Sequence, residues 1–195
     1  MLILPKTIIN FNFKHWDKID FRDHFDYDLK GHCQGIAIKS LDGKIHTFYR
    51  DGLQEHPDDY SYTAYYKLFK PLVDFFDINT TRIRLHQQLP NNETPMHVDY
   101  NNIEVKNNAD YNIRLLTALS ESDDFIYRFK PKGEELKEFT LKKGQSVIFD
   151  PDIVAHGMIN NSKTETRYSL IQIFKAYPVT PWLKDFINTE QIIKL

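Results

Sequence analysis

The sequence predicts a mainly β protein, built as an antiparallel sandwich or barrel. Aromatic residues make up 14% of the 195 residues, and β-branched residues are also plentiful; both kinds favour strands. From residue 111 to residue 174, short apolar or alternating segments are separated by turn-like clusters of Gly, Pro, Asn, Asp and charged residues. Short strands at this spacing are typical of sandwiches and barrels.

The first 79 residues are expected to support this core. Gly35–Lys39 is predicted to be a strand, Leu41–Lys44 contains the Asp-Gly pair of tight hairpin turns, and Ile45–Tyr49 is the expected return strand. Between Ser61 and Phe76 the apolar residues recur at spacings of three and four, which predicts a helix. Pro71 lies inside this stretch and predicts a kink or two helical segments.

The core is expected to span residues 80–177. Arg82–His86 alternates polar and apolar residues as a strand does, Pro90–Glu93 is a predicted turn, and His97–Asp99 is a predicted strand. The later strands are predicted at Tyr111–Leu119, Phe125–Phe129, Phe139–Leu141, Ser146–Phe149, Val154–Ile159 and Arg167–Phe174. Residues 178–195 form a tail with a short helix packed on the barrel, and the whole chain is expected to be one domain.

Composition narrows the possible partners. The net charge of −2 gives no general basic field, so neither nucleic acid nor an acidic membrane is an expected partner. The single Cys33 excludes an intrachain disulfide framework and suits a reducing compartment. Met1–Leu4 is apolar but is followed at once by Pro5 and Lys6, unlike a signal peptide. We therefore expect a cytoplasmic protein without a membrane segment. The oligomeric state stays open, because sheet edges can pair or be covered.

The candidate chemistry begins with His97 and Asp99. On a strand, residues two apart point to the same face, so this imidazole and this carboxylate would converge. His156 on a later strand could complete a 2-His-1-carboxylate triad, the ligand set typical of non-haem Fe(II) oxygenases. A single histidine on a strand is more often an ordinary polar residue, so the prediction depends on the whole set.

Arg167 and Ser169 add a possible anion site. They lie two residues apart, so on a strand they share one face. Three protein ligands would leave three metal positions for a bidentate co-substrate and O₂. A fixed cation must then hold the far carboxylate of that co-substrate, and the guanidinium fork of arginine does this better than lysine.

The order His-x-Asp, distal His and Arg-x-Ser resembles the Fe(II)/2-oxoglutarate-dependent oxygenases. The likeness is closest to their aspartyl/asparaginyl β-hydroxylase-like branch in bacteria and phages. It is carried by Gly35–Ser40, Arg84–Asp99, Asn112–Leu115 and Gly144–Arg167, and covers most of residues 35–175. The resemblance implies a double-stranded β-helix, a cupin-like jelly roll, with a supporting N-terminal α/β segment. It also implies Fe(II), 2-oxoglutarate as co-substrate, and O₂.

The resemblance also assigns roles to residues. His97, Asp99 and His156 match the metal ligands, Arg167 with Ser169 matches the 2-oxoglutarate anchor, and Arg114 matches a family arginine that binds co-substrate or substrate. The sequence departs from the family at Leu116, where relatives have a histidine. The candidates to replace its polar contact, or to bind substrate, are His86, Gln88 and Tyr127. Asp99 fills the carboxylate position that vertebrate-type members lack, which favours hydroxylation over halogenation.

The implied activity is hydroxylation of an unactivated C–H bond of an amino-acid side chain, with release of succinate and CO₂. The substrate would be a peptidyl Asp, Asn or Pro residue or a free amino acid, and loops 50–60 and 100–110 would border the site. Two alternatives stay open: the same chemistry on a nucleobase or another small molecule, and a cupin-like binding module without catalysis. Because the triad and the anchor arginine are all present, catalysis is favoured.

Overall fold

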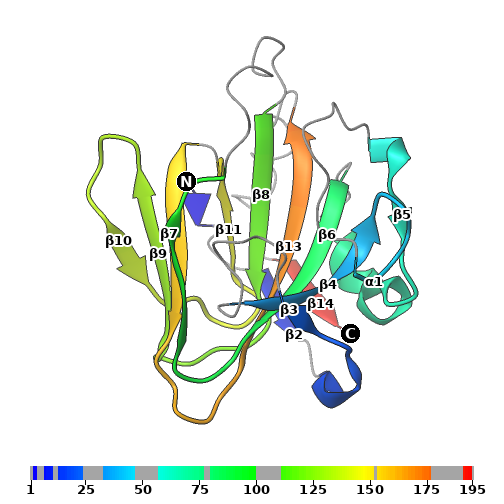
Figure 1. Ribbon diagram of the computed structural model, residues 1–195, viewed down its shortest axis with the longest axis horizontal. Helices are drawn as coiled ribbons and strands as arrows, with labels where there is room; N and C mark the ends of the chain where they lie inside the picture. The colour runs from blue at the N-terminus through cyan, green and yellow to red at the C-terminus, as the bar shows by residue number, and fades with distance from the viewer. Residues whose placement is uncertain are drawn as a thin grey trace.

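Two facing antiparallel sheets form the body of the protein (Figure 1). The larger sheet has the strand order β1-β11-β8-β13-β6-β4-β3, with β5 paired to β4; the smaller one has the order β10-β9-β12-β7. The computed structural model describes residues 2–3, 7–10, 13–23, 33–46, 57–76, 80–99, 111–151, 153–176 and 191–194. The predicted mainly β, jelly-roll architecture is confirmed.

The elements follow one another along the chain with these bounds. They are β1 (Leu2–Ile3), β2 (Thr7–Asn10), the 3₁₀ turn Trp16–Lys18, β3 (Arg22–Asp23), β4 (Gln34–Ser40), the 3₁₀ turn Pro57–Asp59, β5 (Ser61–Tyr62), α1 (Tyr66–Asp74), β6 (Thr80–Gln88), β7 (Asn92–His97), β8 (Tyr111–Ala118), β9 (Phe125–Pro131), β10 (Lys137–Phe139), β11 (Ser146–Phe149), β12 (Val154–Asn160), β13 (Arg167–Ala176) and β14 (Gln191–Lys194).

From β6 to β13 the chain crosses repeatedly between the two sheets, and these crossings bring early and late strands together. In the larger sheet β13 pairs with both β6 and β8; in the smaller sheet β12 pairs with both β7 and β9. Directly opposed residues of an antiparallel pair point to the same face. Residues far apart in sequence therefore share the space between the sheets.

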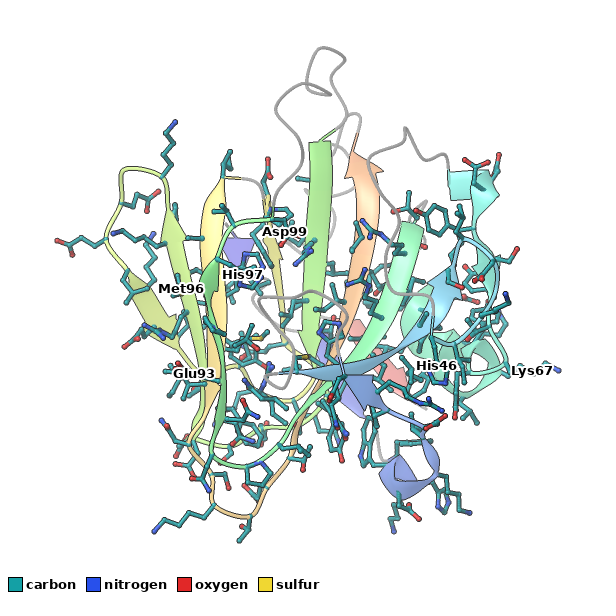
Figure 2. The ribbon with its side chains drawn as sticks, viewed as in Figure 1. His46, Lys67, Glu93, Met96, His97 and Asp99 are labelled. Carbon is teal, nitrogen blue, oxygen red and sulfur yellow. The ribbon has the colours of Figure 1, made fainter. Side chains whose placement is uncertain are left out.

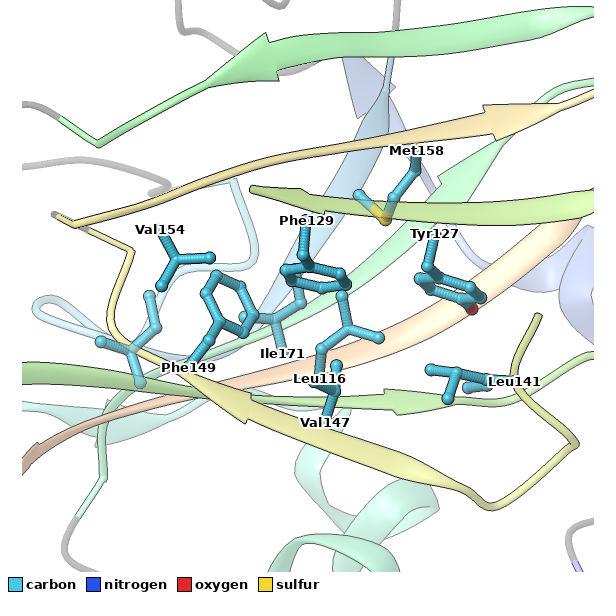
Figure 3. Close-up of a cluster of buried hydrophobic side chains, with 11 residues drawn as sticks. Leu116, Tyr127, Phe129, Leu141, Val147, Phe149, Val154, Met158 and Ile171 are labelled. Atoms are coloured by element: carbon cyan, nitrogen blue, oxygen red, sulfur yellow. The ribbon is translucent and has the colours of Figure 1, made fainter. Parts of the chain in front are cut away.

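Large apolar side chains fill the space between the sheets. Figure 3 shows Tyr127, Phe129 and Met158 of the smaller sheet packed over Leu116 and Ile171 of the larger one. All of them are buried, and the alternation along each strand is what directs them inward. Truncating one such aromatic ring to alanine would cost about 3–5 kcal/mol of stability.

The outer face of the larger sheet is covered by α1, seen beside β4 and β6 in Figure 1. Phe69, Leu72 and Val73 share one helical face and are buried against the apolar residues of β4, β6 and β13. The Gln172 side chain of β13 donates a hydrogen bond to the Val73 carbonyl oxygen at 3.3 Å, which fixes the end of the helix on the sheet. Pro71 is exposed within this helix.

Several predicted boundaries in the N-terminal part are corrected by the structure. The helix is one continuous segment, Tyr66–Asp74, and Ser61–Tyr62 is a short strand that pairs with β4. The Asp-Gly turn is present, with Gly43 at φ 69°. Ile45 and His46 lie in a turn rather than a return strand, and the Ile45 carbonyl accepts a hydrogen bond from Ala37. Residues 47–49 lie outside the described residues.

The core and tail also differ from prediction in detail. The strand expected at His97–Asp99 ends at His97, and β7 begins at Asn92, within the predicted turn. The strand β10 ends at Phe139 rather than beginning there. Residues 191–194 form a strand parallel to β2 instead of part of a helix. Residues 177–190, residues 50–56 of the predicted loop 50–60, and the predicted loop 100–110 lie outside the described residues; the 3₁₀ turn Pro57–Asp59 occupies the end of the first loop. In the described part of the chain, no helix is long and apolar enough to cross a membrane.

Candidate metal centre

His97, Asp99 and His156 meet at one end of the space between the sheets. His97 is the last residue of β7 and stands directly opposite His156 of β12 in the ladder. Asp99 lies two residues beyond β7, where its backbone N–H donates to the Pro151 carbonyl oxygen at 2.9 Å. Figure 2 shows His97 and Asp99 side by side. One ligand atom from each of the three residues lies within 4.8 Å of the others, so the predicted convergence is confirmed.

A β-bulge in β7 is what turns His97 toward His156. Thr94 opposes Met158 and His97 opposes His156, so β7 has one more residue than β12 over this interval. With a regular strand, Met96 would share the face of Thr94 and His97 would point away. Gly157 lies opposite the bulge and has no room for a side chain: an added Cβ would stand 2.8 Å from the Thr94 carbonyl oxygen and 3.1 Å from the Met96 nitrogen.

Both imidazoles are held in the tautomer that binds metal through Nε2. His97 Nδ1 lies 2.8 Å from the Pro95 carbonyl oxygen, and His156 Nδ1 lies 3.1 Å from that of Val154. A carbonyl can only accept, so each Nδ1 carries a hydrogen, and Nε2 is the nitrogen that the neutral ring offers to a metal. Burial, with help from the nearby charges of Arg114 and His97, holds the pKa of His156 well below its usual value. The neutral, metal-binding form is therefore favoured.

The carboxylate of Asp99 divides its two oxygens between different partners. Its Oδ1 lies 3.7 Å from His97 Nε2 and 3.9 Å from His156 Nε2. Metal–ligand bonds of about 2.1 Å at right angles place neighbouring ligand atoms about 3 Å apart, so only a small contraction would be needed. Two imidazoles and one carboxylate form the facial donor set of non-haem iron sites, and these residues fit such an ion.

Arg114 lies at the triad rather than beside Arg167. Its Nη2 donates to Asp99 Oδ2, and its Nη1 lies 3.2 Å from His156 Nε2. It comes from β8, where it opposes Phe149 of β11, so the larger sheet contributes a cation to a site whose ligands come from the smaller one. Its predicted role as a co-substrate or substrate contact stays a prediction.

Arg167 is buried deeper in the same interior. Its Nε donates to Gln88 Oε1 at 3.0 Å, its Nη1 lies 2.8 Å from Met158 Sδ, and its guanidinium carbon lies 5.2 Å from the centre of the Tyr127 ring. Met158 is two residues from His156 on the same face of β12, which is roughly 7 Å along the strand. The guanidinium is thus about one strand repeat below the triad.

Three buried polar atoms of this interior have no hydrogen-bond partner among the described residues. They are Arg167 Nη2, Ser169 Oγ and the Tyr127 hydroxyl, and all three residues are 0% exposed. No acidic side chain of the described part of the chain forms an ion pair with Arg167. A buried donor without a partner costs about 1–3 kcal/mol, more when it is charged, so this is a group of donors suited to an anion.

The structure distinguishes among the three residues that were predicted to replace the polar contact of a histidine at position 116. Gln88 is engaged with Arg167, and His86, which opposes Ser169 on β6, has its Nδ1 3.4 Å from Cys33 Sγ. Tyr127 alone among them combines full burial with an unpartnered hydroxyl beside the guanidinium. Leu116 itself packs in the interior cluster.

Reasoning from the sequence missed three features of the site and its surroundings: Met158, Gly157 and the Cys33–His86 contact. Met158 could have been found, because it follows His156 by one strand repeat and must share its face. The role of Gly157 could not, because no local signal marks the bulge in the strand opposite. Cys33 is buried, and burial raises the pKa of its thiol to about 11 despite the charges of Arg167 and Arg84, so it is not a nucleophile at neutral pH.

Comparison with known proteins identifies the fold. No protein-family model matches the chain, and no curated protein is found to match it. Among solved structures, it is similar to an oxidoreductase of the 2OG-Fe(II) oxygenase family from Burkholderia pseudomallei, with a TM-score of 0.51 and 15% identity over 74% of this chain and 67% of that one. A Drosophila melanogaster CENP-C cupin domain gives a TM-score of 0.42 at 10% identity, over 78% and 70% of the two chains. Oxalate oxidase with bound glycolate gives 0.36 at 14% identity, over 50% and 43%.

Proposed function

We propose that this protein is an Fe(II)/2-oxoglutarate-dependent dioxygenase that hydroxylates an amino-acid side chain, either in a peptide or in a free amino acid. His97, Asp99 and His156 would hold the iron, and bound iron with 2-oxoglutarate would supply the activation of O₂ that hydroxylation of an unactivated C–H bond requires. Succinate and CO₂ would be released. The substrate class rests on the aspartyl/asparaginyl hydroxylase-like resemblance of the sequence.

The observation that carries the proposal is the buried group of donors one strand repeat below the triad. An extended 2-oxoglutarate measures about 5 Å between its carboxyl carbons, because four C–C bonds of about 1.5 Å separate them. That length matches a co-substrate that binds the metal at one end and reaches Arg167 at the other. Ser169 and Tyr127 would add their hydroxyl groups to the carboxylate that Arg167 holds.

The remaining residues of the site act by orientation and by exclusion of water. The Pro95 and Val154 carbonyls fix the two imidazole rings, and Gln88 fixes the plane of the Arg167 guanidinium. Phe129 and Phe149 pack against the His156 ring, at 6.5 and 4.9 Å between centroids, and keep that side of the site dry. A dry, fixed set of donors needs no reorganisation when the co-substrate binds.

The test uses protein loaded with Fe(II) without oxygen. Addition of 2-oxoglutarate is expected to produce the visible charge-transfer absorption of a chelated iron, and admission of O₂ is expected to yield succinate, even without substrate. His97→Ala should abolish both, whereas His46→Ala, which alters a histidine paired with Asp20 at the surface, should change neither. Iron-loaded wild-type protein that neither binds nor consumes 2-oxoglutarate would refute the proposal and favour a binding module without catalysis.

A further inference from the structure

Arg114 engages the lone pair of His156 that a metal ion would need. The bond from His156 Nδ1 to Val154 leaves Nε2 as an acceptor, and Arg114 Nη1 is 3.2 Å away from it. A nitrogen lone pair serves one partner at a time, either the N–H of a guanidinium or a metal ion. The guanidinium of Arg114 is therefore a competitor of a metal ion for one of the three ligands.

The second contact of Arg114 has a different consequence. Arg114 Nη2 donates to Asp99 Oδ2, while Asp99 Oδ1 faces the two histidines at 3.7 and 3.9 Å. This ion pair can persist when Oδ1 binds a metal, because the two oxygens are engaged separately. Metal binding thus requires the loss of one Arg114 contact but not of the other.

The charges of the site also favour the binding of a metal ion together with an anion. The cation of Arg114 and the anion of Asp99 balance, so this ion pair adds no net charge to the site. A divalent ion would add two positive charges next to a guanidinium whose side chain is only 15% exposed, where solvent screens the repulsion poorly. An anion chelated to the metal reduces that excess and gives the released Nη1 a new acceptor.

We infer that Arg114 couples the binding of metal to the binding of a chelating anion. Alone, the metal displaces Arg114 from His156 and binds weakly; with the anion, Arg114 exchanges His156 for a carboxylate oxygen and the metal binds tightly. For its anion, 2-oxoglutarate, the inference rests on the proposed function, whereas the competition between Arg114 and the metal does not. Couplings of this kind are typically 5- to 150-fold in affinity.

The test is a titration with Mn(II), in which the electron paramagnetic resonance signal of the free ion measures the dissociation constant. For the wild type, saturating 2-oxoglutarate is expected to lower this constant by about 10- to 100-fold. Glutarate, which lacks only the 2-oxo group needed for chelation, should do much less. Arg114→Gln is expected to bind Mn(II) alone about tenfold more tightly than the wild type, and to gain at least tenfold less from 2-oxoglutarate.

Arg114→Lys separates charge from contact, because it keeps the cation and loses the fork; its Mn(II) affinity should lie between the other two. Circular dichroism checks that each variant is folded. If Arg114→Gln does not fold, Arg114→Lys decides the comparison.

An Arg114→Gln protein that binds Mn(II) no more tightly than the wild type would overturn the inference. Arg114 would then serve only to orient Asp99. Absence of a 2-oxoglutarate effect in every protein would refute the proposed co-substrate, while the Mn(II) affinities would still decide the competition. If Mn(II) binds to none of them, the metal centre and the inference both fail.

Discussion

Gln88 and Arg167 are fixed to each other inside the barrel, with Gln88 Oε1 accepting from Arg167 Nε at 3.0 Å. The amide of Gln88 donates in turn to the Met158 carbonyl oxygen at 3.1 Å, which determines which end of the amide faces the guanidinium. A neutral partner orients the arginine without cancelling its charge. The charge of Arg167 therefore stays available to an anion, whereas a glutamate at position 88 would neutralise it.

Gln88→Glu is accordingly expected to weaken 2-oxoglutarate binding by at least about tenfold, because the new carboxylate would pair with Arg167 and compete with the ligand. Loss of the amide donor would also remove the hydrogen bond to the Met158 carbonyl, at a cost of about 0.5–1.5 kcal/mol in stability. Isothermal titration of the Mn(II)-loaded protein measures the first effect and urea unfolding the second.

Gln87→Glu provides the matched control. Gln87 is the neighbouring residue on the opposite face of β6, where it pairs with Gln34. It should leave the affinity for 2-oxoglutarate within about twofold of the wild type. Equal losses in the two variants would show that the effect comes from charge on β6 in general and not from Arg167.

Arg167→Lys tests the anchor separately from the metal. Lysine keeps the charge but cannot donate to Gln88 and a carboxylate in one plane, so the affinity for 2-oxoglutarate should fall by one to two orders of magnitude, on the order of 1.5–3 kcal/mol. The affinity for Mn(II) in the absence of 2-oxoglutarate should be unchanged, since no ligand atom is altered. A variant that loses both affinities would place Arg167 in the support of the fold instead.

Gly157→Ala is expected to weaken metal binding by about tenfold or more. The added Cβ would press on the Thr94 carbonyl and the Met96 nitrogen of the bulge, which must shift and turn His97 away from His156. Gly133→Ala serves as the control: no atom lies within 4 Å of its added Cβ, and its φ of 79° costs about 1–2 kcal/mol of stability in the turn after β9. Mn(II) titration and urea unfolding of both variants distinguish a metal effect from general destabilisation; equal metal affinities would contradict the role of the bulge.

The bulge also shows where reading the sequence succeeds for the wrong reason. His97 and Asp99 were predicted to converge because they lie two apart on a strand, yet the strand ends at His97 and the bulge sets its direction. The strands of the core were predictable because their alternation is local. The pairing of β7 with β12, which creates the bulge and requires Gly157, depends on contacts between distant segments and left no local signal.

The positions of the residues proposed to bind the anion were predictable in part, for a related reason. Arg167 and Ser169 share a face by strand period alone, and the structure buries both inside the barrel. Arg114 also reached the interior face, but its contact with the triad depends on the offset between two sheets, which no period in the sequence encodes.

The thiol of Cys33 provides a prediction about stability against pH. Burial raises its pKa to about 11, from an ordinary value near 9.0 in the unfolded chain. The stability that follows is therefore complete below pH 9 and is lost as the pH rises through 11, because only the unfolded chain loses the proton easily in that range. Two pH units correspond to about 2–3 kcal/mol.

The test compares the free energies of unfolding of the wild type and of Cys33→Ala, measured in urea. The difference between the two proteins should be about 2–3 kcal/mol larger at pH 8 than at pH 11. Lysine and tyrosine residues titrate in both proteins, so their contributions cancel in the difference. A difference that does not change with pH, or rapid reaction of Cys33 with a thiol reagent at pH 8, would show that the thiol is not held neutral against His86 in the folded protein.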